Sequence, residues 1–197
     1  YPNKESIGVD NFALPDEMLG THIILAEDNY INQEVAKEFL ESVGFNVIVA
    51  NNHMACRQAN HLAESRGFRA FWDQSTLDGD IASAAKQIYQ SINNGPKGVY
   101  IWGGEPTVKL PDSPGKGGRN QALALLLAQK FSGHSCIRVL VAGTDGTDGP
   151  TDAAGGLIDG ATLKKGSELG LNIQEHIQQA NAYPYLNATD CLFLTGA

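Results

Sequence analysis

Nine consecutive residues, 144–152 (TDGTDGPTD), combine three carboxylates with glycines and threonines directly after an apolar segment of strand length. In open α/β sheets, ligands bind beyond the carboxyl ends of the strands, which is where these residues would lie. Asp145, Asp148 and Asp152 could ligate a hard cation such as Mg²⁺, with Thr144 beside them as a substrate-binding residue. Turn formation and helix capping by the same side chains are the structural alternative. We favour the functional interpretation because the segment has more polar side chains than a turn requires.

A second candidate site opens a leucine-rich segment and consists of Gly117, Gly118, Arg119, Asn120 and Gln121. Glycines let a ligand approach the backbone closely, and a helix N-terminus presents unpaired N–H groups with a partial positive charge. The guanidinium of Arg119 would add a bidentate partner for a phosphate or carboxylate. The structural alternative is a surface loop with a solvated arginine and a capping asparagine. Local chemistry leaves both interpretations open.

A third candidate follows another predicted strand, residues 98–102 (GVYIW), and consists of Gly103, Gly104 and Glu105. Glu105 could orient a substrate hydroxyl or a metal-bound water molecule. It could equally be a turn residue held by the two glycines, so this signal is weak by itself.

The pattern of apolar residues predicts an α/β fold, a mixed or parallel sheet with flanking helices. Runs of strand length occur at residues 22–26, 46–50, 98–102, 137–142 and 191–194. Helical segments are predicted at residues 27–45, 53–66, 80–92, 121–131, 162–169 and 173–180. The first helix would begin at Asp28 or Asn29 as N-cap and end at Gly44. With its two flanking strands it forms a Rossmann-like βαβ start, whose strands should be parallel.

The acidic pair Glu27 and Asp28 also looks like the opening of a response-regulator receiver domain. A receiver needs a phosphoacceptor aspartate at the end of a third apolar strand. Residues 67–80 (GFRAFWDQSTLDGD) predict no apolar strand that leads to Asp73 or Asp78. We therefore favour capping roles for Asp28 and its neighbour.

Composition excludes several classes of protein. The net charge of −8 and the absence of a basic stripe argue against nucleic-acid binding. Three cysteines without a CxxC pair argue against a disulfide framework and a zinc site, and the five histidines have no metal-binding spacing. No apolar run approaches the ~20 residues of a membrane span and no signal peptide is visible, so we expect a cytoplasmic protein.

Turn-forming residues at 93–98 (NNGPKG) and a shift in composition indicate a boundary near residue 95. We expect an irregular leader over residues 1–20, a βαβ segment over residues 21–95 and a glycine-rich module over residues 96–197. The last two could also share one compact domain. A start at Tyr1 rather than Met indicates a fragment, a processed product or missing residues upstream.

Three motifs, GGEPTV, GKGGRNQALAL and AGTDGTDGPTDAAGGLIDG, together resemble the hallmark segments of the glycerate 2-kinase family. They belong to its C-terminal module, the MOFRL domain, formerly labelled hydroxypyruvate reductase. The later segments ANAYPYL and LFLTG fit in order and spacing, and a weaker likeness extends upstream to about residue 20. Pro106 and Ala122 stand where the family more often has threonine and glutamate.

The resemblance implies a two-domain α/β enzyme that transfers phosphate from ATP to the 2-hydroxyl of D-glycerate with Mg²⁺. Arg119 matches the family's proposed catalytic arginine, which would neutralise charge on the transferring phosphoryl group. Asp145, Asp148 and Asp152 match metal or substrate ligands, and Glu105 matches a residue of the cleft between the domains.

The family's N-terminal domain, with its glycine/serine-rich loop and catalytic lysine, is missing from this sequence. We therefore expect a C-terminal half that is inactive without that domain. The alternative is a standalone MOFRL-like module that binds a small anion, or regulates, without catalysis. The expected partners are D-glycerate, a nucleotide and the missing half, and a homodimer is compatible with the sequence. We expect no binding to nucleic acid or to a membrane.

Overall fold

A computed structural model describes residues 15–27 and 30–196 of the chain. The proposed caps Asp28 and Asn29 lie outside the described residues. The elements follow one another in the order η1 (Asp16–Met18), β1 (His22–Ala26), α1 (Tyr30–Ser42), β2 (Asn46–Ala50), α2 (Asn52–Ser65), β3 (Ala70–Leu77), α3 (Ile81–Asn94), β4 (Val99–Gly104), α4 (Arg119–Lys130), β5 (Arg138–Ala142), β6 (Gly155–Asp159), α5 (Thr162–Glu168), α6 (Ile173–Gln178), α7 (Ala182–Ala188) and β7 (Leu192–Phe193). This mixed α/β fold, with parallel and antiparallel sheets flanked by helices, is the predicted fold class.

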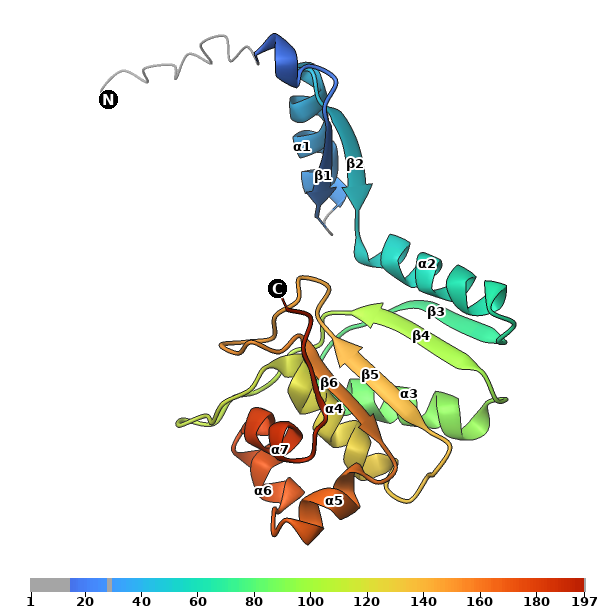
Figure 1. Cartoon of the computed structure of the whole chain (residues 1–197), viewed down its shortest axis with the longest axis vertical. Coiled ribbons are helices and arrows are strands. Elements are labelled where there is room, and N and C mark those ends of the chain that lie inside the picture. Colours follow the sequence, from blue (N-terminus) through green and yellow to red (C-terminus); the bar gives the residue numbers. More distant parts are fainter. Residues whose placement is uncertain (1–14, 28–29, 197) are drawn as a thin grey trace.

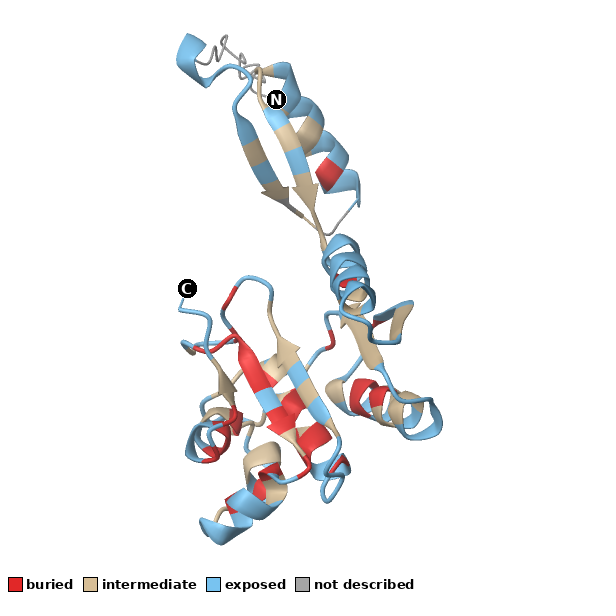
Figure 2. Ribbon diagram, turned by 45° about the vertical axis from the view of Figure 1, so that its right-hand side comes forward, coloured by how far each residue is buried: buried red, intermediate tan, exposed pale blue. Residues whose placement is uncertain are grey.

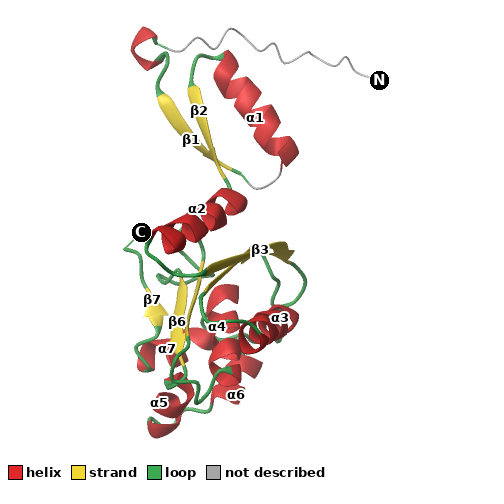
Figure 3. Cartoon of the chain, turned by 90° about the vertical axis from the view of Figure 1, so that its right-hand side faces the viewer, coloured by secondary structure: helices red, strands yellow, loops and turns green. Residues whose placement is uncertain are grey.

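The elements β1, α1 and β2 form an arm that stands apart from the rest of the molecule (Figure 1). The two strands are parallel and pair from His22 with Asn46 to Ala26 with Ala50, as predicted for a βαβ unit. Gly44 follows α1 with φ +106°, a conformation that side-chain-bearing residues avoid, which accounts for a glycine at this helix end. Helix α2 lies between the arm and the body, as a second view shows (Figure 3).

In the body, β3 pairs in parallel with β4, from Ala70 with Val99 to Leu77 with Gly104. Strand β3 corrects the expectation that residues 67–80 contain no apolar strand leading to Asp73 or Asp78, because Ala70, Phe71 and Trp72 directly precede Asp73 in this strand. Its polar second half hid it from the apolar pattern, and the register shifts between Trp72 and Thr76. A bulge of this kind locally disrupts the pairing and re-aims side chains, which is common beside functional sites.

A second, antiparallel sheet has the strand order β5–β6–β7 and packs on α4. Strand β6 was not predicted, because Gly155 and Gly156 look like part of a loop. Helix α7 was not predicted either. The structure explains these glycines by close packing. A Cβ on Gly156 would lie 2.8 Å from the Cβ of Ala124 in α4, so only glycine lets the strand approach the helix this closely.

The hydrophobic core centres on α4, which was predicted to be buried because it is apolar nearly all round. Leu125, Leu127 and Phe131 are fully buried, and each such side chain contributes about 1.5–3 kcal/mol relative to exposure. Buried residues gather in the body, whereas the arm is almost entirely exposed or half-buried (Figure 2). Helix α4 is therefore a rigid support for whatever lies at its N-terminus.

Helix α3 packs against α4 through Ala84, Ala85 and Ile88, so residues 70–95 share a core with the C-terminal half. The domain boundary near residue 95 stays a prediction, and it would fall between the paired strands β3 and β4. Among the described residues, no helix has the length and apolar character needed to cross a membrane.

Candidate functional site

Two adjoining hollows lie beside the N-terminus of α4. The larger, called the cleft, has a volume of about 770 Å³ and the smaller, called the compartment, has a volume of about 400 Å³. Both volumes are within the roughly 300–1,000 Å³ typical of ligand sites. The hollows meet at a shared wall, which is formed by Arg119, Asn120, Gly143 and Asp145. Predicted residues at the start of α4 and beyond the end of β5 therefore converge, although they are far apart in the sequence.

The cleft is lined mainly by the beginning of α2 and by the carboxyl ends of β3, β4 and β5. Its residues lie within segments 50–56, 72–76, 103–105 and 142–145, together with Glu27, Arg119 and Asn120. Besides the residues of the shared wall, four predicted site residues line the cleft, namely Gly103, Gly104, Glu105 and Thr144. Strands β4 and β5 belong to different sheets, yet the carboxyl ends of both reach the cleft, and this brings the predicted residues together.

Sequence reasoning missed the wall of the cleft that α2 and β3 provide. Asp73 accepts hydrogen bonds from the Ser75 amide at 3.0 Å and from the Ser75 hydroxyl at 2.6 Å, and these bonds lower the pKa of the Asp73 carboxyl. Asn52 packs directly on Gly103, where a Cβ would lie 2.4 Å from the Asn52 amide. This wall would have been recognised if β3 had been predicted from the sequence, because the polar residues of β3 follow Trp72 in a strand that pairs with β4.

Arg119 is held by an ion pair with Glu105, with Nη2 and Oε1 2.6 Å apart. The side chains of Arg119 and Glu105 are 43% and 59% exposed, so the pair adds little to stability. An exposed carboxylate that occupies the guanidinium is also readily exchanged for another anion. The Arg119 guanidinium thus has an exposed carboxylate as its partner in the cleft, the same kind of group as a phosphate or a substrate carboxylate.

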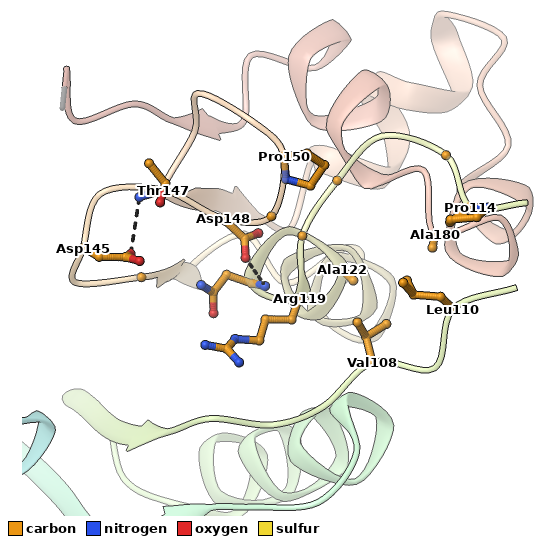
Figure 4. A pocket seen from close by; sticks show the side chains of 16 residues that line it. Val108, Leu110, Pro114, Arg119, Ala122, Asp145, Thr147, Asp148, Pro150 and Ala180 are labelled. Carbon is orange, nitrogen blue, oxygen red and sulfur yellow. Dashed lines mark hydrogen bonds between the residues drawn. The ribbon is translucent and has the colours of Figure 1, made fainter. Parts of the chain in front are cut away.

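Asp148 does not face a cation but caps α4. Its carboxylate accepts a hydrogen bond from the backbone N–H of Asn120 at 3.1 Å (Figure 4) and a second from that of Gln121 at 2.8 Å. Burial raises the pKa of Asp148, and these two bonds oppose the rise. Gly118 is required for this contact, because a Cβ there would lie 2.3 Å from Cγ of Asp148. The predicted anion site at the helix N-terminus is thus filled by the protein's own carboxylate, and Arg119 remains as its outward-facing part.

Residues 98–197 match the MOFRL family. The chain belongs to the MOFRL family. It is 37% identical over 172 residues to a glycerate 2-kinase of Pyrococcus horikoshii, covering 83% of this chain and 39% of that protein. It is 35% identical over 157 residues to a D-glycerate 2-kinase of Thermotoga maritima, covering 76% and 37%. The crystal structure of a Thermotoga maritima glycerate kinase matches with a TM-score of 0.74 and 26% identity, covering 90% of this chain and 54% of that one.

These relatives confirm the resemblance to the glycerate 2-kinase family that the three motifs indicated. The chain spans less than two fifths of the length of the two curated relatives. The MOFRL match begins at residue 98, just before β4, and so includes Glu105, Arg119 and the loop that contains Asp145. It does not include the wall of the cleft formed by α2 and β3.

Within the MOFRL segment, the glycine-rich loop before α4 is fixed by the connection between α6 and α7. The backbone N–H of Gly115 donates to the Gln179 carbonyl at 2.8 Å, and that of Lys116 donates to Oδ1 of Asn181 at 2.9 Å. The Lys116 carbonyl accepts a bond from the Tyr183 amide at 3.0 Å. The loop is therefore organised before any ligand arrives.

The three aspartates of the MOFRL segment play different parts. Asp145 is exposed and lines both hollows, whereas Asp152 lines neither and accepts a hydrogen bond from the Tyr183 hydroxyl at 2.8 Å, which lowers the Asp152 pKa. In the part of the chain that the structure describes, no three His, Cys, Asp or Glu side chains form a group able to hold a metal. The predicted set of Asp145, Asp148 and Asp152 is therefore not assembled as a metal site.

Proposed function

We propose that this chain is the C-terminal half of a glycerate 2-kinase, which transfers phosphate from ATP to the 2-hydroxyl of D-glycerate. The observation that carries the proposal is the position of Arg119 at the wall shared by the two hollows. Its guanidinium is paired with the exposed carboxylate of Glu105, which a bound anion could displace. A two-substrate enzyme needs such a junction, because the transferring group must pass between two bound molecules. The names of the relatives supply the identity of the two substrates.

The residues of the shared wall would stabilise charge rather than perform covalent chemistry. Phosphoryl transfer requires mainly positioning and neutralisation of the charge on the phosphoryl oxygens. Arg119 would leave Glu105 and donate to those oxygens, while Asn120 and Thr144 would donate hydrogen bonds from the same side. Glu105, once released, could accept a hydrogen bond from the glycerate hydroxyl. The backbone of Gly103 and Gly104 would allow close approach of the small substrate.

Mg²⁺ fits this site only as a companion of the nucleotide. A nucleotide-bound Mg²⁺ takes most of its ligands from phosphates and water, and one or two carboxylates from the protein. The exposed position of Asp145 in both hollows meets that need, whereas Asp148 is buried against the backbone of α4 and Asp152 lines neither hollow. When bound, the ion would neutralise charge on the phosphates.

A missing N-terminal domain would complete the enzyme, and the arm supports this part of the proposal. Ile24 and Ile48 lie opposite each other in the β1–β2 ladder and are 73% and 48% exposed. Parallel sheets are normally covered on both faces, so a two-stranded parallel sheet with exposed isoleucines is suited to contact a further domain. The proposal places the protein in the cytoplasm, where nucleotide and glycerate are available.

A chimera tests the proposed function. This chain would replace the matching segment of the Pyrococcus horikoshii relative, and the product formed from ATP, Mg²⁺ and D-glycerate would be identified by ³¹P NMR. We expect 2-phosphoglycerate from the chimera and none from the isolated chain, with the unaltered relative as positive control. Binding of both substrates without product would contradict catalysis and favour the alternative, an anion-binding or regulatory module.

A further inference from the structure

Part of the lining of the compartment is apolar, and phosphate groups would not bind there. Its walls include aliphatic and proline side chains, namely Val108, Leu110, Pro114, Ala122, Pro150 and Ala180. Figure 4 shows Val108, Leu110, Pro114 and Ala180 gathered at one end, with Asp145 and Arg119 toward the other. The compartment thus has an apolar end and a charged end.

We propose that the apolar end of the compartment binds the purine base of the nucleotide, an assignment that rests on the proposed kinase function. D-glycerate carries an oxygen on every carbon and has no apolar face. The nucleotide base is the only part of either substrate whose flat faces gain from contact with aliphatic side chains. Ligand pockets typically combine such apolar walls with a few polar groups that fix orientation.

The geometry connects the base to the reacting end of the nucleotide. A base between Val108, Leu110 and Pro150 would direct its phosphates toward Arg119 and Asp145, which belong to both hollows. The terminal phosphate would then enter the cleft, where glycerate is expected. Asp148 also lines the compartment, but its carboxylate is turned to the backbone of α4 and is only 4% exposed. It therefore opposes the phosphates less than a free carboxylate would.

The cleft is the rival position for the base, and its chemistry suits it less. Asp73, Glu105 and Asp145 line it together with asparagine, serine and threonine side chains, and its two ring side chains, His53 and Trp72, are packed edge to face on each other with centroids 4.6 Å apart. Such a surface suits a hydroxy acid and metal-bound phosphates. One wall of the compartment is also held by the bonds of Gly115 and Lys116 to residues 179–181. Preformed walls reduce the entropy lost when a ligand binds.

The test compares two double variants of the full chain. V108A/L110A removes apolar contacts from the compartment, and L140A/L157A removes an exposed, paired set of leucines from the outer face of the β5–β6 sheet as a matched control. Binding of a ribose-labelled fluorescent ATP and of tripolyphosphate, which lacks the base, would be measured for both. We expect V108A/L110A to weaken ATP binding about tenfold, which is ~1.4 kcal/mol, and to leave tripolyphosphate binding unchanged. The control should change neither.

Photo-crosslinking locates the base independently of the variants. An azido-adenine nucleotide attached to the wild-type chain should label residues 108–122 or 145–150. Labelling of residues 50–76 instead, or equal ATP affinity of V108A/L110A and the control, would overturn the assignment while leaving a kinase function intact. Absence of ATP binding by the wild-type chain would overturn it as well. Correct labelling together with an inactive chimera would instead contradict the proposed function.

Discussion

Replacement of Arg119 by alanine is expected to lower kcat of the chimeric enzyme by at least about 100-fold. Loss of a single preorganised donor to a developing charge costs roughly 10²–10³ in rate, and an arginine that stabilises a phosphoryl group can be worth 10³–10⁵. The effect should fall mainly on kcat, because in the proposed function the guanidinium would contact the transferring group and would exchange only one partner, Glu105, on binding. Steady-state kinetics with D-glycerate and ATP measure it.

Arg138 provides the matched control for this substitution. It is also ion-paired, with Nη1 2.9 Å from Oδ2 of Asp159, but it lies at the far end of β5 from the site. Arg138→Ala should leave kcat within about twofold, and Arg119→Lys should restore part of the lost rate because it keeps the charge without the planar fork. Full activity of Arg119→Ala would remove this arginine from the catalytic role.

Replacement of Asp148 by asparagine is expected to lower the free energy of unfolding by about 1–3 kcal/mol. The carboxylate accepts from the N–H groups of both Asn120 and Gln121, and an amide can accept only through its single oxygen. One buried N–H group would then face an NH₂ group, and the negative charge at the N-terminus of α4 would be lost. Urea unfolding of the isolated chain measures the change.

The variant Asp145→Asn distinguishes the two roles considered for these aspartates from the sequence, which are cation binding and helix capping. Asp145 is exposed and lines both hollows, so its substitution should change the unfolding free energy by less than about 0.5 kcal/mol. In the chimera it should nevertheless lower turnover. Equal destabilisation by both substitutions, or by neither, would show that Asp148 is not the cap that holds the loop to α4.

The parts of the fold that the sequence predicted are those in which one signal dominates. The helical spacing and glycine end of α1, and the continuous apolar surface of α4, identified both helices. Strands β3 and β6 were missed because tertiary contacts decide them. Residues of β3 turn polar where the strand reaches the cleft, and Gly155 and Gly156 are strand residues only because α4 packs too closely for a side chain.

The site was predictable in position but not in its internal contacts. The ends of β4 and β5 bring Glu105 and Asp145 to the cleft, and the start of α4 brings Arg119 there, although β4 and β5 belong to different sheets. The spacing of carboxylates could not show that Asp148 turns back to cap α4, because a cap and a cation ligand call for the same residue type. The wall formed by Asn52 and Asp73 depends on β3 and was missed together with it.

A crystal structure of the chimera with ADP, aluminium fluoride and D-glycerate tests the central claim most directly. The account predicts that Arg119 leaves Glu105 and donates to the fluoride-bearing group at the wall between the two hollows. A phosphoryl mimic held elsewhere, with the 2.6 Å pair between Arg119 and Glu105 still intact, would contradict it.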